Sequence, residues 1–236
     1  FEKYFSLHKK AVEEGLLMKF VPASGAASRM FKKLEIADKE NLSYKDLKQK
    51  EDKPEYKAAL EFVENIKRFA FIEDLKKEIE KTELDSSKII EEKDADKIIH
   101  FTINPEGLNY SALPKGSIKF HQYEDHSRTA FEEQLVEAVN YSSQKEKKAI
   151  IHFTVPEEFK NDIRKNLNEA KKRFEENVEI EIHYSVQKPE TDTVAVDLGN
   201  KPFVENDGSI LFRPAGHGAL IENMNDLYAD IVLIKN

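Results

Sequence analysis

The stretch Lys19-Phe-Val-Pro-Ala-Ser-Gly-Ala-Ala-Ser-Arg-Met-Phe-Lys32 decides the fold of this chain. Its first residues belong to an apolar run over 16–23 that has the length of a buried strand. Small residues follow and lead into a helix pattern, which predicts a strand that turns directly into a helix. Such a turn directs backbone N–H groups and the positive end of the helix dipole toward one point, and Arg29 adds a fixed positive charge. The stretch therefore predicts a phosphate-binding loop in an α/β fold.

Strand and helix patterns alternate in the rest of the chain. Three further strand candidates are apolar or alternating segments, over 98–103, 149–155 and 178–186. The last of them alternates strictly, which indicates a strand near a sheet edge. A helix pattern over 157–177 connects two of these strands, and another helix begins at a capping box of Thr129 and Glu132. The alternation predicts an α/β architecture with a mainly parallel sheet.

Residues 38–97 differ from the rest because they are rich in Lys, Glu and Asp and contain no Gly. Their apolar positions recur at helical spacing, so we interpret them as a helical insertion with solvated charged faces. We expect one α/β domain over 1–236 with this insertion inside it. Because the apolar run Ile231–Ile234 lies close to Asn236, we also expect the domain to be truncated at its C-terminus.

Composition narrows the possible functions. Hydrophobic residues make up 39% and charged residues 35% of the chain, and the formal net charge is -8. A negative chain argues against broad binding to nucleic acid or an anionic membrane, although a local cationic cluster can still bind a phosphate ligand. The chain has no cysteine, so thiolate chemistry and disulfides are excluded and a cytoplasmic location is the expectation. No apolar stretch approaches the length of about 20 residues that a membrane helix needs.

Two later loops have the same character as the first. Lys115 lies between Pro114 and Gly116, where it can reach a phosphate, and Arg213-Pro-Ala-Gly-His-Gly218 places two glycines around His217. Each of the three loops also has a purely structural interpretation. The first could be a tight turn with a surface arginine, the Lys115 segment a solvated turn, and His217 an ordinary loop histidine. The first loop matches neither the P-loop nor the dinucleotide fingerprint. The remaining histidines considered, His100, His152 and His183, lie on strand patterns and are interpreted as core or face residues.

In this order the three loops resemble those of the nucleotidyltransferases that make nucleotide sugars, especially the UDP-sugar pyrophosphorylases. Over longer stretches the chain resembles an uncharacterised bacterial family known as domain of unknown function 4301. The stretches that carry this resemblance lie at 20–32, 128–137 and 212–223.

The pyrophosphorylase resemblance implies a GT-A-like, Rossmann-like sheet and a reaction of a nucleoside triphosphate with a sugar 1-phosphate that gives a nucleotide sugar and pyrophosphate. It implies that Arg29 and Lys115 are catalytic, because they stabilise charge on the departing pyrophosphate. The implied nucleotide-binding residues are Ala23, Ser24, Gly25, Ala26, Ser28, Gln187, Gly216, His217 and Gly218. It also implies Mg²⁺, held by an aspartate that would follow Ile231–Ile234; the chain stops at Asn236, so no metal ligand is assigned.

Other interpretations remain open. The first loop has fewer glycines than the characterised enzymes, so a non-catalytic nucleotide-binding or scaffold protein on the same fold is the alternative. A GT-A glycosyltransferase would need an acidic metal motif after a strand, and Asp192 and Asp197 do not form one. The enzyme hypothesis requires that the three loops, including Arg29 and His217, line one cleft.

Overall fold

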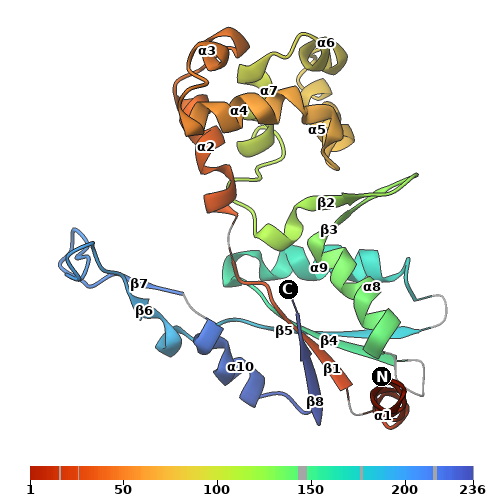
Figure 1. The fold of residues 1–236 in the computed structure, drawn as a ribbon. Helices are drawn as coiled ribbons and strands as arrows, with labels where there is room; N and C mark the ends of the chain where they lie inside the picture. Colours follow the sequence, from red (N-terminus) through yellow and green to blue (C-terminus); the bar gives the residue numbers. More distant parts are fainter. Residues whose placement is uncertain (16, 26, 143–147, 176–177, 215–216, 236) are drawn as a thin grey trace. The chain divides into compact units, whose positions relative to one another are not determined.

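The computed structural model describes residues 1–15, 17–25, 27–142, 148–175, 178–214 and 217–235, without the side chains of Ser28 and His217. The chain forms two compact units (Figure 1). Unit 1 comprises Phe1–Ser24 and Gln134–Asn236, and unit 2 comprises Gly25–Glu133. Helices and strands are both present, so the fold is mixed α/β.

A parallel four-stranded sheet in the order β5-β4-β1-β8 lies at the centre of unit 1 (Figure 1). Its strands are β1 (Leu17–Pro22), β4 (Lys148–Thr154), β5 (Glu179–Ser185) and β8 (Ile231–Ile234). The three strands predicted near residues 16–23, 149–155 and 178–186 are confirmed, and β5 is an edge strand as expected. The sheet is compatible with a Rossmann-like fold. Its strand order reverses beside β1, and open α/β sheets bind ligands beyond the carboxyl ends of strands at such a point.

The two faces of this sheet carry different helices. Lys19 of β1 hydrogen-bonds to α8 (Ala130–Ser142), which therefore covers one face. Side chains alternate along a strand, so Phe20 and its register partner His152 lie on the opposite face. That second face contacts α10 (Ile221–Asn225), because Asn223 reaches Ser185 at the end of β5. Unit 1 also contains the helices η3 (Glu157–Phe159), α9 (Lys160–Lys171) and η5 (His217–Leu220).

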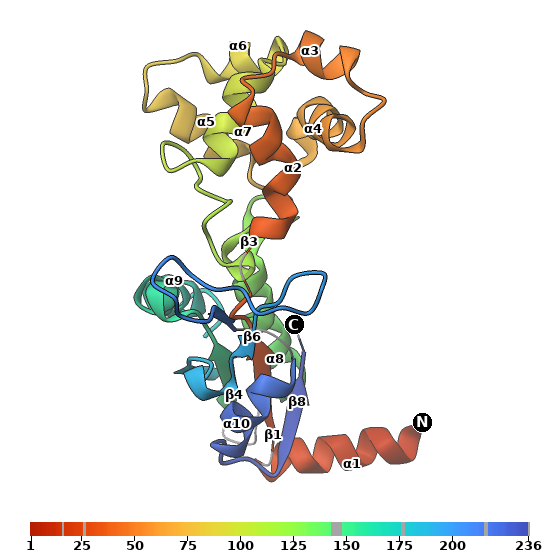
Figure 2. The same ribbon diagram turned by 90° about the vertical axis from the view of Figure 1, so that its left-hand side faces the viewer.

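Two peripheral elements of unit 1 bury almost nothing. Helix α1 (Glu2–Glu13) has no buried residue and projects from the sheet (Figure 2). A β-arm begins after η4 (Pro189–Thr191) and is built on the antiparallel pair β6 (Thr193–Val194) and β7 (Phe212–Arg213). Between these strands every residue except Ala195 and Leu211 is exposed. Neither element contributes to the core of the unit.

Unit 2 is a helical body with its own core of buried aliphatic and aromatic side chains. Its helices are α2 (Ser28–Lys39), α3 (Tyr44–Gln49), α4 (Pro54–Glu64), η1 (Ile66–Arg68), α5 (Ile72–Glu80), α6 (Ser86–Glu91), α7 (Ala95–Ile103) and η2 (Lys115–Ser117). A hairpin of β2 (Lys119–Gln122) and β3 (Ser127–Thr129) follows. The predicted insertion over 38–97 is helical, and the helical unit continues beyond it on both sides.

The predicted strand over 98–103 is wrong, because these residues form most of α7. The run is mostly apolar because this side of the helix packs into the core of unit 2, where Ile98, Ile99 and Ile103 are each at most 1% exposed. A short apolar run has no period that separates a buried strand from a buried helix. Asp94 gives the missing signal, because its side chain accepts the N–H of Lys97 and starts the helix. His100 therefore lies on a helix.

The predicted capping box of α8 is confirmed. The N–H of Thr129 donates to Glu132 at 2.7 Å, and the N–H of Glu132 donates to the Thr129 hydroxyl at 3.2 Å. This reciprocal pair satisfies two donors at the start of the helix.

Candidate functional site

The first loop leaves the sheet at a well-anchored point. The N–H of Ala23 donates to the carbonyl of Thr154 at 3.0 Å and to its hydroxyl at 3.2 Å, and Thr154 is fully buried. This contact fastens the end of β1 to the end of β4. It also means that the backbone N–H of Ala23 is already used by the protein. Ser24 ends this part of unit 1, and Gly25 begins unit 2.

Within unit 2 the first loop and the Pro-Lys-Gly segment are joined by backbone hydrogen bonds. The N–H of Lys115 donates to the carbonyl of Gly25 at 3.1 Å, and the N–H of Ala27 donates to the carbonyl of Leu113 at 3.3 Å. Two of the segments singled out in the sequence therefore form one structural element, although they lie far apart in the chain. This element is the loop pair, residues 25–29 and 113–116.

The glycines of the loop pair serve different purposes. A Cβ added to Gly116 would lie 2.6 Å from the ring of Phe131, so the fold itself requires a glycine there. A Cβ added to Gly25 would meet no atom within 4 Å, and its backbone is not in the left-handed region. Packing of the described residues gives no reason for a glycine at position 25. An exposed backbone without a side chain is what close approach of a ligand needs.

Helix α2 begins in an unusual electrostatic setting. Its N-cap is Ala27, which provides no side-chain cap, and its first turn holds no acidic residue. Each of the other α-helices of nine or more residues in the described part of the chain has an acidic residue there. α2 instead carries Arg29 beside the positive end of its own dipole, which costs roughly 0.3–1 kcal/mol. A bound anion would satisfy the uncapped N–H groups and the guanidinium together.

The two cations of the loop pair are exposed. Among the described residues neither Arg29 nor Lys115 has an acidic partner within 4.0 Å. Neighbouring cations differ, since Lys119 pairs with Asp74 and Arg128 pairs with Glu133. Positive charge at the loop pair is therefore not neutralised by the described part of the protein.

The predicted base-binding residues belong to unit 1. Gln187 follows β5, is 8% exposed and donates through Nε2 to Asp192 at 3.0 Å. His217 and Gly218 open η5, and a Cβ added to Gly218 would meet no atom within 4 Å. Ala26 and Gly216 lie outside the described residues, as do the side chains of Ser28 and His217.

The site residues thus fall into two sets. Gly25, Arg29 and Lys115 belong to unit 2, whereas Ala23, Ser24, Gln187, His217 and Gly218 belong to unit 1. The single cleft expected from the sequence stays a prediction.

A buried polar network near Gln187 was not found from the sequence. Asn223 of α10 is 2% exposed and donates through Nδ2 to the hydroxyl of Ser185 and to the carbonyl of Val186, each at 2.9 Å. The same hydroxyl lies 2.7 Å from Nε2 of His152. Burial, with a smaller effect from nearby His183, lowers the pKa of His152 to about 4, so its ring is neutral at pH 7. His152 lies in the core, one of the two positions that the sequence left open for it. The sequence signal for the network was the polar residue Ser185 at the carboxyl end of β5.

A second feature that the sequence analysis did not find is a charged triad on the face of the sheet that α8 covers. Lys19 is fully buried, donates to Glu137 at 2.9 Å and to the carbonyl of Gln134 at 3.0 Å, and Lys235 donates to Glu137 at 2.6 Å. Burial lowers the pKa of Lys19, partly offset by its hydrogen bond to Glu137. Partial burial by itself would raise the pKa of Glu137, but hydrogen bonds and charge from Lys235 and Lys19 lower it to about 2. The triad ties α8 to β1 and to the end of β8.

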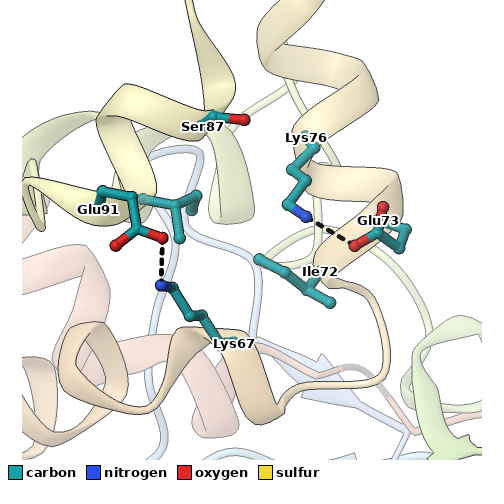
Figure 3. Close-up of a pocket in the computed structure, with 7 residues that line it drawn as sticks. Lys67, Ile72, Glu73, Lys76, Ser87 and Glu91 are labelled. Carbon is teal, nitrogen blue, oxygen red and sulfur yellow. Dashed lines mark hydrogen bonds and ion pairs between the residues drawn. The ribbon is translucent and has the colours of Figure 1, made fainter.

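Among the described residues that line a hollow of about 250 Å³ in unit 2, no lysine is free to contact a ligand (Figure 3). Its two lysines point at carboxylates: Lys67 pairs with Glu91 at 2.5 Å, and Lys76 pairs with Glu73 at 2.8 Å. This charge compensation distinguishes the hollow from the loop pair.

The described residues contain no group of three or more His, Asp or Glu side chains arranged to hold a metal ion. The Mg²⁺ implied by the resemblance stays a prediction. No helix in the described ranges has the length and apolar character needed to cross a bilayer.

The model of the family described as Domain of unknown function (DUF4301) matches residues 1–236. The chain belongs to this family, which confirms the closer of the two resemblances. No curated protein and no solved structure gives a significant match. The link to the UDP-sugar pyrophosphorylases therefore rests on the loops alone.

Proposed function

We propose that this protein is a nucleotidyltransferase that moves a nucleoside monophosphate from a nucleoside triphosphate to a sugar 1-phosphate and releases pyrophosphate. The observation that carries the proposal is the loop pair: an uncapped helix start with exposed Arg29 and Lys115, tied together through Gly25. A GT-A-type arrangement of the Rossmann-like sheet is part of the same proposal. The substrates are small anions, consistent with a local cationic cluster on a chain of net charge -8.

The chemistry is an in-line displacement at the α-phosphorus. An oxygen of the sugar phosphate forms a bond to this phosphorus while the bond to the oxygen that bridges the α- and β-phosphorus breaks, and the electron pair leaves with pyrophosphate. Arg29 offers a planar fork to the departing phosphate oxygens, and Lys115 acts as a point charge. Backbone N–H groups at the start of α2 add donors to the same anion. No covalent enzyme intermediate is needed.

Recognition of the nucleobase is assigned to Gln187, Gly216, His217 and Gly218. Asp192 engages one of the two Nε2–H donors of Gln187, so Oε1, which accepts a base N–H, and the second N–H would be the groups that contact a base. The open backbone at Gly218 suits a flat ring lying against it.

The test is pyrophosphate release from a panel of nucleoside triphosphates and sugar 1-phosphates with Mg²⁺. Arg29→Ala should lower kcat/KM by about a hundredfold or more if Arg29 stabilises the transition state. Arg68→Ala is the matched control, because Arg68 is also exposed in unit 2 and bonds only locally, to Asn65. Equal rates for the Arg29 variant and the wild type would remove Arg29 from the mechanism.

A non-catalytic nucleotide-binding or scaffold protein is the second candidate. Exposed apolar side chains on α1 favour it, since Tyr4 is 75% and Phe5 69% exposed, and such patches often contact partner proteins. Nucleotide binding without turnover across the whole panel would support this candidate.

A further inference from the structure

One buried side chain joins the end of β5 to helix α10. Asn223 uses both protons of its carboxamide, one on the Ser185 hydroxyl and one on the Val186 carbonyl. With both protons engaged, the side chain has one orientation. Both acceptors lie at 2.9 Å, which is a normal hydrogen-bond length.

The network continues into the sheet. The Ser185 hydroxyl accepts from Asn223 and can donate to Nε2 of His152 at 2.7 Å. The His152 ring stacks on Phe20 of β1, with ring centres 5.5 Å apart. Asn223 is therefore bonded to the end of β5 and linked indirectly, through Ser185 and His152, to β4 and β1.

Asn223 connects two predicted base-contact segments, one through a hydrogen bond and the other along the chain. The Val186 carbonyl belongs to the peptide group that carries the N–H of Gln187, so the bond from Asn223 fixes the direction in which Gln187 leaves the strand. Helix α10 follows η5 without a break, and η5 begins with His217 and Gly218. A shift of Asn223 would move both segments.

The side-chain carbonyl of Asn223 indicates that the two N–H groups, and not the oxygen, are the reason for an asparagine at this position. Oδ1 of Asn223 is buried and has no hydrogen-bond partner among the described residues. Burying an unpaired acceptor costs free energy, and an apolar side chain of similar size would avoid that cost. The two N–H groups of Asn223 therefore provide hydrogen bonds to Ser185 and Val186 that an apolar side chain could not make.

We infer that Asn223 is a positioning residue for nucleobase recognition, which holds Gln187 and the His217–Gly218 segment in a fixed relation; the inference rests on the proposed function. Asn223 itself does not contact the base. Its removal should weaken discrimination between nucleobases and leave the binding of phosphate groups unchanged.

The experiment compares Asn223→Ala and Asn223→Asp with the wild type. The aspartate variant keeps the volume but lacks both N–H groups. Dissociation constants are measured for the four common ribonucleoside triphosphates and for inorganic triphosphate, which has no base. Both variants should reduce the ratio between the best and the worst nucleobase by up to about tenfold, the effect of losing one or two net hydrogen bonds. Affinity for inorganic triphosphate should not change.

Ser142→Ala is the matched control for general loosening. Ser142 is fully buried in unit 1 and donates to the carbonyl of Ala138 at 2.7 Å, away from α10. Its loss should lower stability without changing the nucleobase ratio. A ratio that falls equally in the control, or stays at the wild-type value in both Asn223 variants, would overturn the inference.

Amide hydrogen exchange separates failure of the inference from failure of the proposed function. Exchange in residues 185–188 and 217–222 should rise together in the Asn223 variants and stay unchanged in Ser142→Ala. If the wild type binds no nucleotide, the proposed function and the recognition role both fall, and this exchange pattern still shows whether Asn223 couples the two segments. Exchange that rises in only one segment would refute the coupling itself.

Discussion

The most quantitative prediction concerns the neutral, buried His152. Its pKa is lowered to about 4 in the folded protein from 6.5, first by burial and then by the nearby His183. His152 is 8% exposed, so solvent screens it little. Between these two values the unfolded chain binds the proton and the folded chain does not. The free energy of unfolding must therefore fall as the pH is lowered from 6.5 toward about 4.

The magnitude follows from the two pKa values. Linkage gives a loss of about 2 kcal/mol by pH 5 and about 3 kcal/mol by pH 4, relative to pH 7.5. Below about pH 3 this contribution hardly changes further. The groups that face His152 are His183, the Ser185 hydroxyl and the ring of Phe20, and His183 is itself paired with Glu181.

The assay compares the wild type with His152→Gln, which does not titrate and keeps an acceptor near the position of Nε2. Urea unfolding is followed by circular dichroism at pH values from 4 to 7.5, because the chain has no tryptophan. The difference in unfolding free energy between the two proteins cancels most other titrations and should shift by about 3 kcal/mol in favour of the variant at low pH. A difference that is constant over this range, or an NMR pKa of His152 near 6.5, would refute the reasoning.

Further predictions concern the glycines and the charged triad. Gly25→Ala should leave the unfolding free energy within about 0.5 kcal/mol of the wild type, whereas Gly116→Ala should cost about 1–3 kcal/mol because its Cβ would press on Phe131. Thermal unfolding measures both, and equal losses would contradict this assignment. Glu137→Gln should lower the unfolding free energy by about 3 kcal/mol at pH 7, because it leaves the buried ammonium of Lys19 without its carboxylate. Lys19→Met should lower the unfolding free energy by less. The cost of Glu137→Gln should fade as the pH drops from 4.5 toward about 2, where the carboxylate protonates in the wild type; a larger cost for Lys19→Met would reverse the expected order.

Much of the sheet could be predicted because its strands have unambiguous patterns. β1 and β4 are apolar runs next to helix patterns, and the alternation in β5 identified it as an edge strand. α7 could not be identified in this way, because the short run 98–103 contains only one residue of its half-exposed polar face, His100, and so shows no helical period. The Asp94 cap was the local signal that could have corrected it.

The candidate site was only partly visible in the sequence. The absence of an acidic residue at the start of α2, with Arg29 in its place, can be read directly from the chain. The hydrogen bond between Lys115 and Gly25 cannot, because it joins distant segments through backbone atoms that carry no sequence signature. The same holds for Asn223, whose two acceptors become its neighbours only when α10 packs against β5.

The central claim is that the start of α2 and the Lys115 segment bind a polyphosphate. An NMR titration of the protein with inorganic triphosphate tests this most directly. We expect the backbone amide signals of Gly25, Arg29 and Lys115 to shift together with one dissociation constant, and the shifts to vanish in an Arg29→Ala/Lys115→Ala double variant. Shifts confined to other segments, such as the hollow beside Lys67 and Lys76, or shifts that persist in the double variant, would contradict the claim.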